Sequence, residues 1–234
     1  MPFTIYDERL QDETAKQYAY RTLRRNILLL DMLPGEVVVE KDICTRLKVS
    51  RTPVREALLE LSRERLIDIV PQRSTQVTLL DEQLVEQGRF LRENIEIAVL
   101  ELACKGVSPT ALEALKANLV EQEKLAESQD IIGFFMKDSE FHRLLFAAVD
   151  KDTVYEAVSL FIPHFTRERM LRLQMFDAVE LLHDHKHITE HMENHDFKTA
   201  RLYMKRHLDR VICDQKILKE AYPTYFGYSL SRMK

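Results

Sequence analysis

The sequence predicts a mainly α-helical protein in which an N-terminal winged helix-turn-helix is followed by an all-α antiparallel helical bundle. Three observations lead to this fold class. Only five Gly and seven Pro interrupt 234 residues of which 45% are hydrophobic, as is typical of an ordered helical protein. Near the N-terminus, two short helical patterns joined by a tight turn precede a hairpin pattern. After residue 80, long helical patterns follow one another with short breaks.

The first expected helix is Glu13–Leu30. It carries Ala19, Leu23, Ile27 and Leu30 at the spacing of one buried helix face. The residues before it are polar and give no clear helical pattern.

The helix-turn-helix consists of Lys41–Leu47 and a second helix that begins at about residues 51 to 53. Pro53 is tolerated there because a first turn does not use its missing N–H. The apolar face of this second helix is formed by Val54, Ala57, Leu58 and Leu61. Arg51 and Arg55 lie one turn apart at its exposed start, where guanidinium groups can reach guanine edges in a major groove. The alternative is a surface helix with two solvated arginines.

A β-hairpin, the wing, follows the two helices. Its expected strands are Leu66–Val70 and Gln76–Leu79, which are rich in β-branched residues and flank a polar tip at Pro71–Thr75. Residues 1–80 are therefore predicted to form one small domain.

Residues 81–221 are predicted to form the helical bundle. Asp81 and Ser108 are suitable N-caps, and Pro163 breaks or kinks the path. The expected helices are Glu82–Lys105, Pro109–Ser128, Asp130–Val149, Thr153–Phe161, Phe165–Met175, Ala178–Glu193 and Phe197–Ala221. Residues 222–234 form an aromatic tail without periodicity.

The charge balance suits a protein that makes few contacts with a specific DNA site. The net charge is −4, yet residues 1–77 carry 13 Lys and Arg against 12 Asp and Glu. No apolar run is long enough to cross a membrane, and the N-terminus lacks the apolar region of a signal peptide. With three widely spaced cysteines, these features predict a cytoplasmic protein.

The N-terminal domain resembles the GntR superfamily of bacterial transcription regulators. The resemblance is carried by Leu33–Glu36, Glu40–Ile43, Val49–Leu58 and the wing, and the run Ser50–Leu58 is nearly the family consensus. It implies a homodimer that binds a palindromic double-stranded DNA operator. The residues that it assigns to DNA contact are Lys41, Arg51, Thr52, Arg55 and, at the wing tip, Arg73.

Two positions depart from that family pattern. Lys41 stands where an arginine is common, and lysine is a point donor rather than a fork. Ser74 replaces a usual glycine of the wing.

All eight histidines lie between His142 and His207. Asp138 and His142 are four residues apart and share one helix face, and His185 lies in the apolar face of a later helix. His207 flanks the apolar face of the last helix. At 1.5 Å per residue, a helical hairpin that turns near residues 194–196 brings His185 and His207 to nearly the same level.

Asp138, His142, His185 and His207 are therefore predicted to converge on one divalent transition metal, Zn, Mn, Ni, Fe or Co. One alternative is a set of satisfied core histidines. A di-iron bundle is another, but it needs two Glu-x-x-His pairs and only Glu180–His183 fits. The other histidines of the same helix fall on its opposite side and are expected to be solvated: His183, His187 and His191.

The second domain resembles the FCD ligand-binding domain of the FadR-like GntR subfamily. The motifs are Arg92-x-x-Ile95-Glu96, Asp138-x3-His142 and His185-x-x-Ile188, with a late helix ending in Arg206-His207-Leu208. The resemblance implies the same four metal ligands, and it places an effector-contacting arginine at Arg92. We expect a small carboxylate effector at the metal, although Glu96, one turn later, could instead pair with Arg92.

The sequence thus predicts a DNA-binding transcriptional regulator whose helical domain binds a metal and an organic-acid effector. A metal-dependent enzyme and a metal-responsive sensor are the alternatives. An enzyme would need a general base or nucleophile beside an open metal position. We find no such arrangement and expect no catalytic residues and no enzyme.

Overall fold

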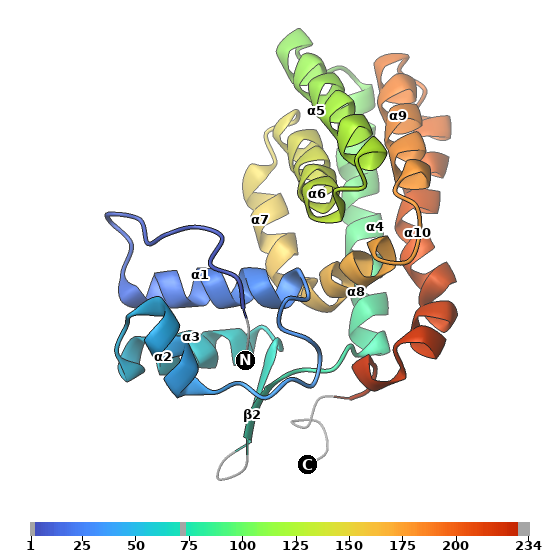
Figure 1. The fold of residues 1–234 in the computed structure, drawn as a ribbon. Helices are drawn as coiled ribbons and strands as arrows, with labels where there is room; N and C mark the ends of the chain where they lie inside the picture. Colours follow the sequence, from blue (N-terminus) through green and yellow to red (C-terminus); the bar gives the residue numbers. More distant parts are fainter. Residues whose placement is uncertain (1–2, 71–73, 229–234) are drawn as a thin grey trace. The chain divides into compact units, whose positions relative to one another are not determined.

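The computed structural model describes residues 3–70 and 74–228 and confirms a mainly α fold with a small two-stranded sheet (Figure 1). The chain forms two compact units. The first contains the residues up to Val85, Pro163–Met170 and the residues from Lys216; the second contains Glu86–Ile162 and Leu171–Gln215. The elements are α1 (Ala15–Leu28), α2 (Glu40–Leu47), α3 (Arg51–Arg63), β1 (Ile67–Val70), β2 (Ser74–Val77), α4 (Glu82–Cys104), α5 (Pro109–Glu127), α6 (Ile131–Ala147), α7 (Asp152–Phe161), α8 (Pro163–Leu173), α9 (Val179–Glu193), α10 (Phe197–Ala221) and a short 3-10 turn, η1 (Pro223–Tyr225).

Helix α1 begins one residue after Thr14, whose side chain accepts a hydrogen bond from the backbone of Gln17. The Gln17 side chain in turn accepts from the Thr14 backbone, so the helix starts with a capping box. Three of the residues expected on its inner face are buried: Ala19, Leu23 and Ile27. The fourth, Leu30, is also buried, but it lies beyond the end of α1 with a left-handed backbone, so the helix ends two residues earlier than expected.

Helices α1, α2 and α3 enclose the core of the winged unit. A left-handed residue, Lys48, makes the turn between α2 and α3. The predicted apolar face of α3 is buried at Val54, Ala57, Leu58 and Leu61. Ser50 occupies the N-cap position of α3 without a side-chain hydrogen bond, so burial of the apolar face is the main visible support for this helix.

In the wing, β1 begins one residue later than the expected strand Leu66–Val70, and β2 begins two residues earlier than the expected strand Gln76–Leu79. Ile67 pairs with Val77, and Val70 pairs with Ser74. Burial of Ile67 and Val77 fixes this register, which brings Ser74 and Thr75 into the strand and shortens the tip. The loop before α2 adds further pairing, because the Gly35 N–H donates to the Val77 carbonyl at 2.9 Å.

The aromatic tail is partly fixed to the winged unit. The Leu80 N–H donates to the carbonyl of Tyr225 at 2.8 Å, and the Gly227 N–H donates to the carbonyl of Leu80 at 3.0 Å. These hydrogen bonds form a short parallel bridge between Leu80 and Phe226. Local periodicity could not have predicted this long-range pairing.

In the helical unit, α5 packs against both α6 and α9, and α6 packs against α7 (Figure 1). Both predicted caps are present: Asp81 Oδ1 accepts from the Gln83 and Leu84 N–H groups, and the Ser108 side chain accepts from the Ala111 N–H. Asp130, which was not predicted as a cap, accepts from the Gly133 N–H at the start of α6. Pro163 is the first residue of α8, directly after the break that ends α7. Across residues 3–70 and 74–228, no helix has the length and apolar composition needed to span a membrane.

Candidate functional site

The predicted DNA-contact residues lie at the surface of the winged unit. Lys41 is exposed in the first turn of α2, and Arg51, Thr52 and Arg55 are exposed in the first two turns of α3. Because these residues are exposed, their side chains are accessible to a ligand. Arg73 lies outside the residues that the structure describes.

The Arg55 guanidinium has a partner on the helix before it. Its Nε lies 2.9 Å from Oε2 and 3.2 Å from Oε1 of Glu40. The Arg55 side chain is 63% exposed, so this ion pair is solvated and contributes little to stability. Glu40 orients Arg55 at the start of α3. Because the ion pair is weak, Arg55 can exchange Glu40 for another partner at little cost in free energy.

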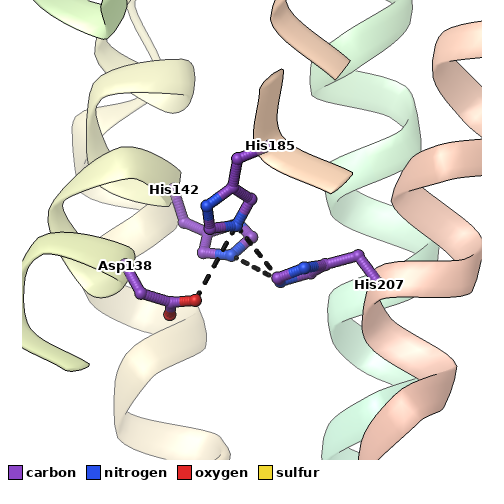
Figure 2. Close-up of side chains that lie close together, drawn as sticks. All are labelled: Asp138, His142, His185 and His207. Carbon is purple, nitrogen blue, oxygen red and sulfur yellow. Dashed lines mark hydrogen bonds and ion pairs between the residues drawn. The ribbon is translucent and has the colours of Figure 1, made fainter. Parts of the chain in front are cut away.

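Four side chains from three helices of the second unit meet at one point (Figure 2). Asp138 and His142 come from α6, His185 from α9 and His207 from α10, and all four are buried. One ligand atom from each lies within 4.8 Å of those of the others. The structure therefore brings together the residues that the sequence singled out.

The distances between these atoms suit a shared cation. His207 Nε2 lies 3.2 Å from His142 Nε2 and 3.4 Å from His185 Nε2. His185 Nε2 lies 3.7 Å from Oδ1 of Asp138. Of two Nε2 atoms that face each other, only one can donate a proton to the other. The three Nε2 atoms therefore cannot all be paired, and the lone pairs left facing one another repel unless a cation lies between them.

The outer nitrogens of two of the histidines are occupied by other helices. His142 Nδ1 lies 2.7 Å from Oε2 of Glu96 on α4. His185 Nδ1 lies 2.8 Å from the side-chain oxygen of Gln122 on α5. A carboxylate only accepts, so a neutral His142 that donates to Glu96 has its proton on Nδ1 and its unprotonated Nε2 toward the centre. This is the orientation that a metal-binding histidine needs.

Burial keeps the two imidazoles neutral. It lowers the pKa of His185 to about 3 and also lowers the pKa of His142. Burial alone would raise the pKa of Glu96, but the Arg92 guanidinium and His142 outweigh it and lower the value to about 2. Neutral imidazoles are the form in which histidine binds a divalent transition metal.

Sequence reasoning missed the residues that orient His185. Gln122 donates through Nε2 to Asn118 Oδ1 at 2.7 Å, and Asn118 donates to the Lys137 carbonyl at 3.1 Å. A signal was present: the buried face of α5 consists of Leu115, Asn118, Leu119 and Gln122. Two amides in an otherwise apolar face indicate buried polar partners.

Arg92 is buried one turn before Glu96 on α4, and its Nε donates to Oε1 of Glu96 at 2.5 Å. The partner that the sequence offered as the alternative is therefore in place. Through Glu96, the guanidinium is connected to His142 and to the four-residue cluster. An effector contact by Arg92 stays a prediction.

A separate hollow of about 770 Å³ lies among the end of α5, the start of α6, the residues after α8 and the start of α9. None of the four cluster residues lines it. Its charged lining is mainly acidic: Glu123, Glu127, Asp130 and Asp177 against Lys186. A carboxylate would be repelled there, so this hollow suits an organic anion less well than the cluster does.

Two known protein families match the chain, one in each of its two predicted domains. Residues 15–77 match the family described as bacterial regulatory proteins, gntR family, and residues 89–210 match the FCD domain. The chain belongs to the GntR family and carries an FCD domain. The regulator is 30% identical to the HTH-type transcriptional repressor RspR of Escherichia coli K12, over 92% of this chain and 95% of that protein.

Solved structures show the same fold. Escherichia coli McbR/YncC matches with a TM-score of 0.76 at 17% identity, over 90% of this chain and 99% of that one. A putative GntR transcriptional regulator from Rhodococcus sp. RHA1 matches with a TM-score of 0.70 at 21% identity, over 88% and 98%. The protein is thus a DNA-binding transcriptional regulator and not an enzyme, as the sequence predicted.

Proposed function

We propose that this regulator acts as a homodimer on a two-fold-symmetric operator, and that its helical domain, residues 81–221, holds one divalent transition metal. The metal is Zn, Mn, Ni, Fe or Co, and its ligands are Asp138, His142, His185 and His207. One observation carries this proposal: three Nε2 atoms and a carboxylate oxygen converge in a buried centre, with the outer nitrogens of two histidines already occupied.

The DNA contacts are proposed for the domain of residues 1–80. Arg51 and Arg55 would read base edges, Thr52 would contact the backbone or a base, and Lys41 would contact phosphate. Their exposure around the start of α3 supports this assignment. Arg73 is proposed on the family resemblance alone.

The effector is proposed to be a small carboxylate, such as a sugar acid or another metabolic organic acid, bound at the metal. Four protein ligands leave positions open on an ion that prefers five or six, and a carboxylate oxygen is a suitable occupant. Arg92 would supply positive charge beside the centre, directly or through Glu96. To change DNA binding, the effector must bind one conformation of the regulator better than another.

Calorimetry with a panel of organic acids tests this proposal. We expect one class of acid to bind wild-type protein, to bind much less to metal-stripped protein, and to lose about 1.5–3 kcal/mol in Arg92→Ala, the range for a hydrogen bond to a charged group. Lys186→Ala is the matched control, because it removes a cation from the acidic hollow and should leave affinity unchanged.

The same measurements separate the alternatives. A DNA-releasing ligand that is neutral, or that binds equally to wild type, Arg92→Ala and stripped protein, would contradict the carboxylate at the metal. Loss of operator binding on chelation, with no organic ligand needed, would instead identify a metal-responsive sensor.

A further inference from the structure

The outer face of α9 carries a second group of histidines, separate from the buried centre. His183, His187 and His191 follow one another at intervals of one turn, and Glu190 lies beside them. Their imidazoles are accessible, with side chains 56%, 30% and 24% exposed in that order. His185, the metal ligand proposed above, points from the same helix into the core.

Tyr203 of α10 holds two of these rings in place. Its ring is stacked on His187 with centroids 4.4 Å apart and planes 10° apart. It also lies 5.7 Å from the ring of His191, at an angle of 16°. Because both imidazoles are already ordered, a ligand that uses them loses less conformational entropy on binding.

The nitrogen of His187 that faces Glu190 lacks a hydrogen-bond partner. His187 Nδ1 is shielded from solvent, and Oε2 of Glu190 lies 3.4 Å from it. The opposite nitrogen, Nε2, lies 3.1 Å from Nε2 of His183. Nη2 of Arg206 can only donate to Nδ1 of His183, so a neutral His183 carries its proton on Nε2 and donates it to Nε2 of His187. The proton of His187 then lies on Nδ1, toward Glu190. A divalent ion that binds there replaces this proton and contacts both the imidazole and the carboxylate.

His191 is oriented in a similar way. Its Nδ1 lies 3.3 Å from Oδ2 of Asp196 in the turn after α9. A carboxylate that accepts from Nδ1–H leaves Nε2 as the ligand atom. Ligand atoms of His187, Glu190 and His191 all lie within 4.8 Å of one another.

We propose that His187, Glu190 and His191 form a second, exposed site for a divalent transition metal. Two imidazole nitrogens and one carboxylate oxygen favour Zn²⁺, Ni²⁺, Cu²⁺ or Co²⁺ over Mg²⁺ and Ca²⁺. With three ligands from one helix and water completing the coordination, the ion exchanges faster than one in the buried centre. The chain therefore holds two classes of ion, one retained and one exchangeable.

His183 is excluded from the ligand set by its neighbour. Nη2 of Arg206 lies 3.4 Å from Nδ1 of His183, and the same guanidinium is paired with the buried Asp184. A fixed positive charge at this end of the histidine row disfavours a dication there. The ion is placed at the other end, between Glu190 and the turn that contains Asp196.

Titration of the intact protein with Ni²⁺ tests the exposed site. Wild type should take up one more ion per chain than His187→Ala or His191→Ala. Glu190→Gln keeps the shape of the side chain without its charge, and it should weaken binding of that ion by about 10–100-fold or more, the loss found even for outer partners of metal ligands. His183→Ala should retain the site.

The readout is the difference between wild type and His187→Ala, so it does not depend on whether the buried centre is filled. Equal uptake by these two proteins would overturn the proposal. So would loss of the ion in His183→Ala with unchanged uptake in Glu190→Gln, because the ion would then belong to the pair His183 and His187. The difference between the Cu²⁺ electron paramagnetic resonance spectra of wild type and His187→Ala should show an ion with two coordinated nitrogens.

Discussion

His185→Ala should remove the retained metal ion and destabilise the helical domain. We expect metal content to fall from about one ion per chain to near zero, because a buried centre that loses one of three imidazoles binds a dication far less tightly. An ion present at 100 times its dissociation constant contributes about 2.7 kcal/mol to stability. Gln122, left without its partner, adds a cost of about 1–3 kcal/mol.

Elemental analysis after extensive dialysis, together with denaturant unfolding, measures both effects. His187→Ala is the control on the same helix, since it removes an exposed imidazole and should leave the retained ion in place. If the two variants lose the same amount of retained metal, the buried cluster is not the centre.

Arg51→Ala and Arg55→Ala should each weaken operator binding by about 1–3 kcal/mol per half-site if the guanidinium is bidentate to guanine. The effect should depend on the base at one position of the operator, because each fork reads one base. Lys41→Ala should weaken binding more evenly across sequences and reduce its salt dependence, as expected for a phosphate contact. Titration at fixed salt, with a duplex selected from a random pool, measures these changes.

Two further variants control for charge. Arg201→Ala removes an exposed arginine from α10, far along the chain from α3, and should leave operator affinity unchanged. Glu40→Gln releases Arg55 from its ion pair and should not weaken binding. Unaltered affinity of Arg55→Ala for the selected operator would remove this residue from the interface.

The parts of the fold that follow from local periodicity were predictable. The buried faces of α1 and α3 agree with the apolar spacing of the sequence, since burial of one helix face is what makes these helices stable. Pairings between distant segments were not predictable in this way. The register of the wing depends on which residues of β1 and β2 become buried together, and the bridge between Leu80 and Phe226 joins segments with no common pattern.

The candidate metal centre was predictable because two regular rules combine there. Asp138 and His142 share one face of α6 because they are four residues apart. A short turn between α9 and α10 brings His185 level with His207, and the Nε2 atoms of these two histidines lie 3.4 Å apart. The amides behind the centre come from another helix, so no rule within one helix links Gln122 to His185. The exposed histidines of α9 were expected to be solvated. Their contact with Tyr203 depends on the packing of α9 against α10, which the spacing of residues within one helix does not show.

X-ray absorption at the metal edge of the purified regulator identifies the ligands of the retained ion. We expect a first shell of nitrogen and oxygen only, with imidazole scattering from three histidines and distances of about 2.0–2.2 Å for zinc or a similar ion. The retained ion should give this spectrum in wild type and in His187→Ala alike. A shell containing sulfur, a shell of oxygen alone, or the absence of a retained ion would contradict a centre built from Asp138, His142, His185 and His207.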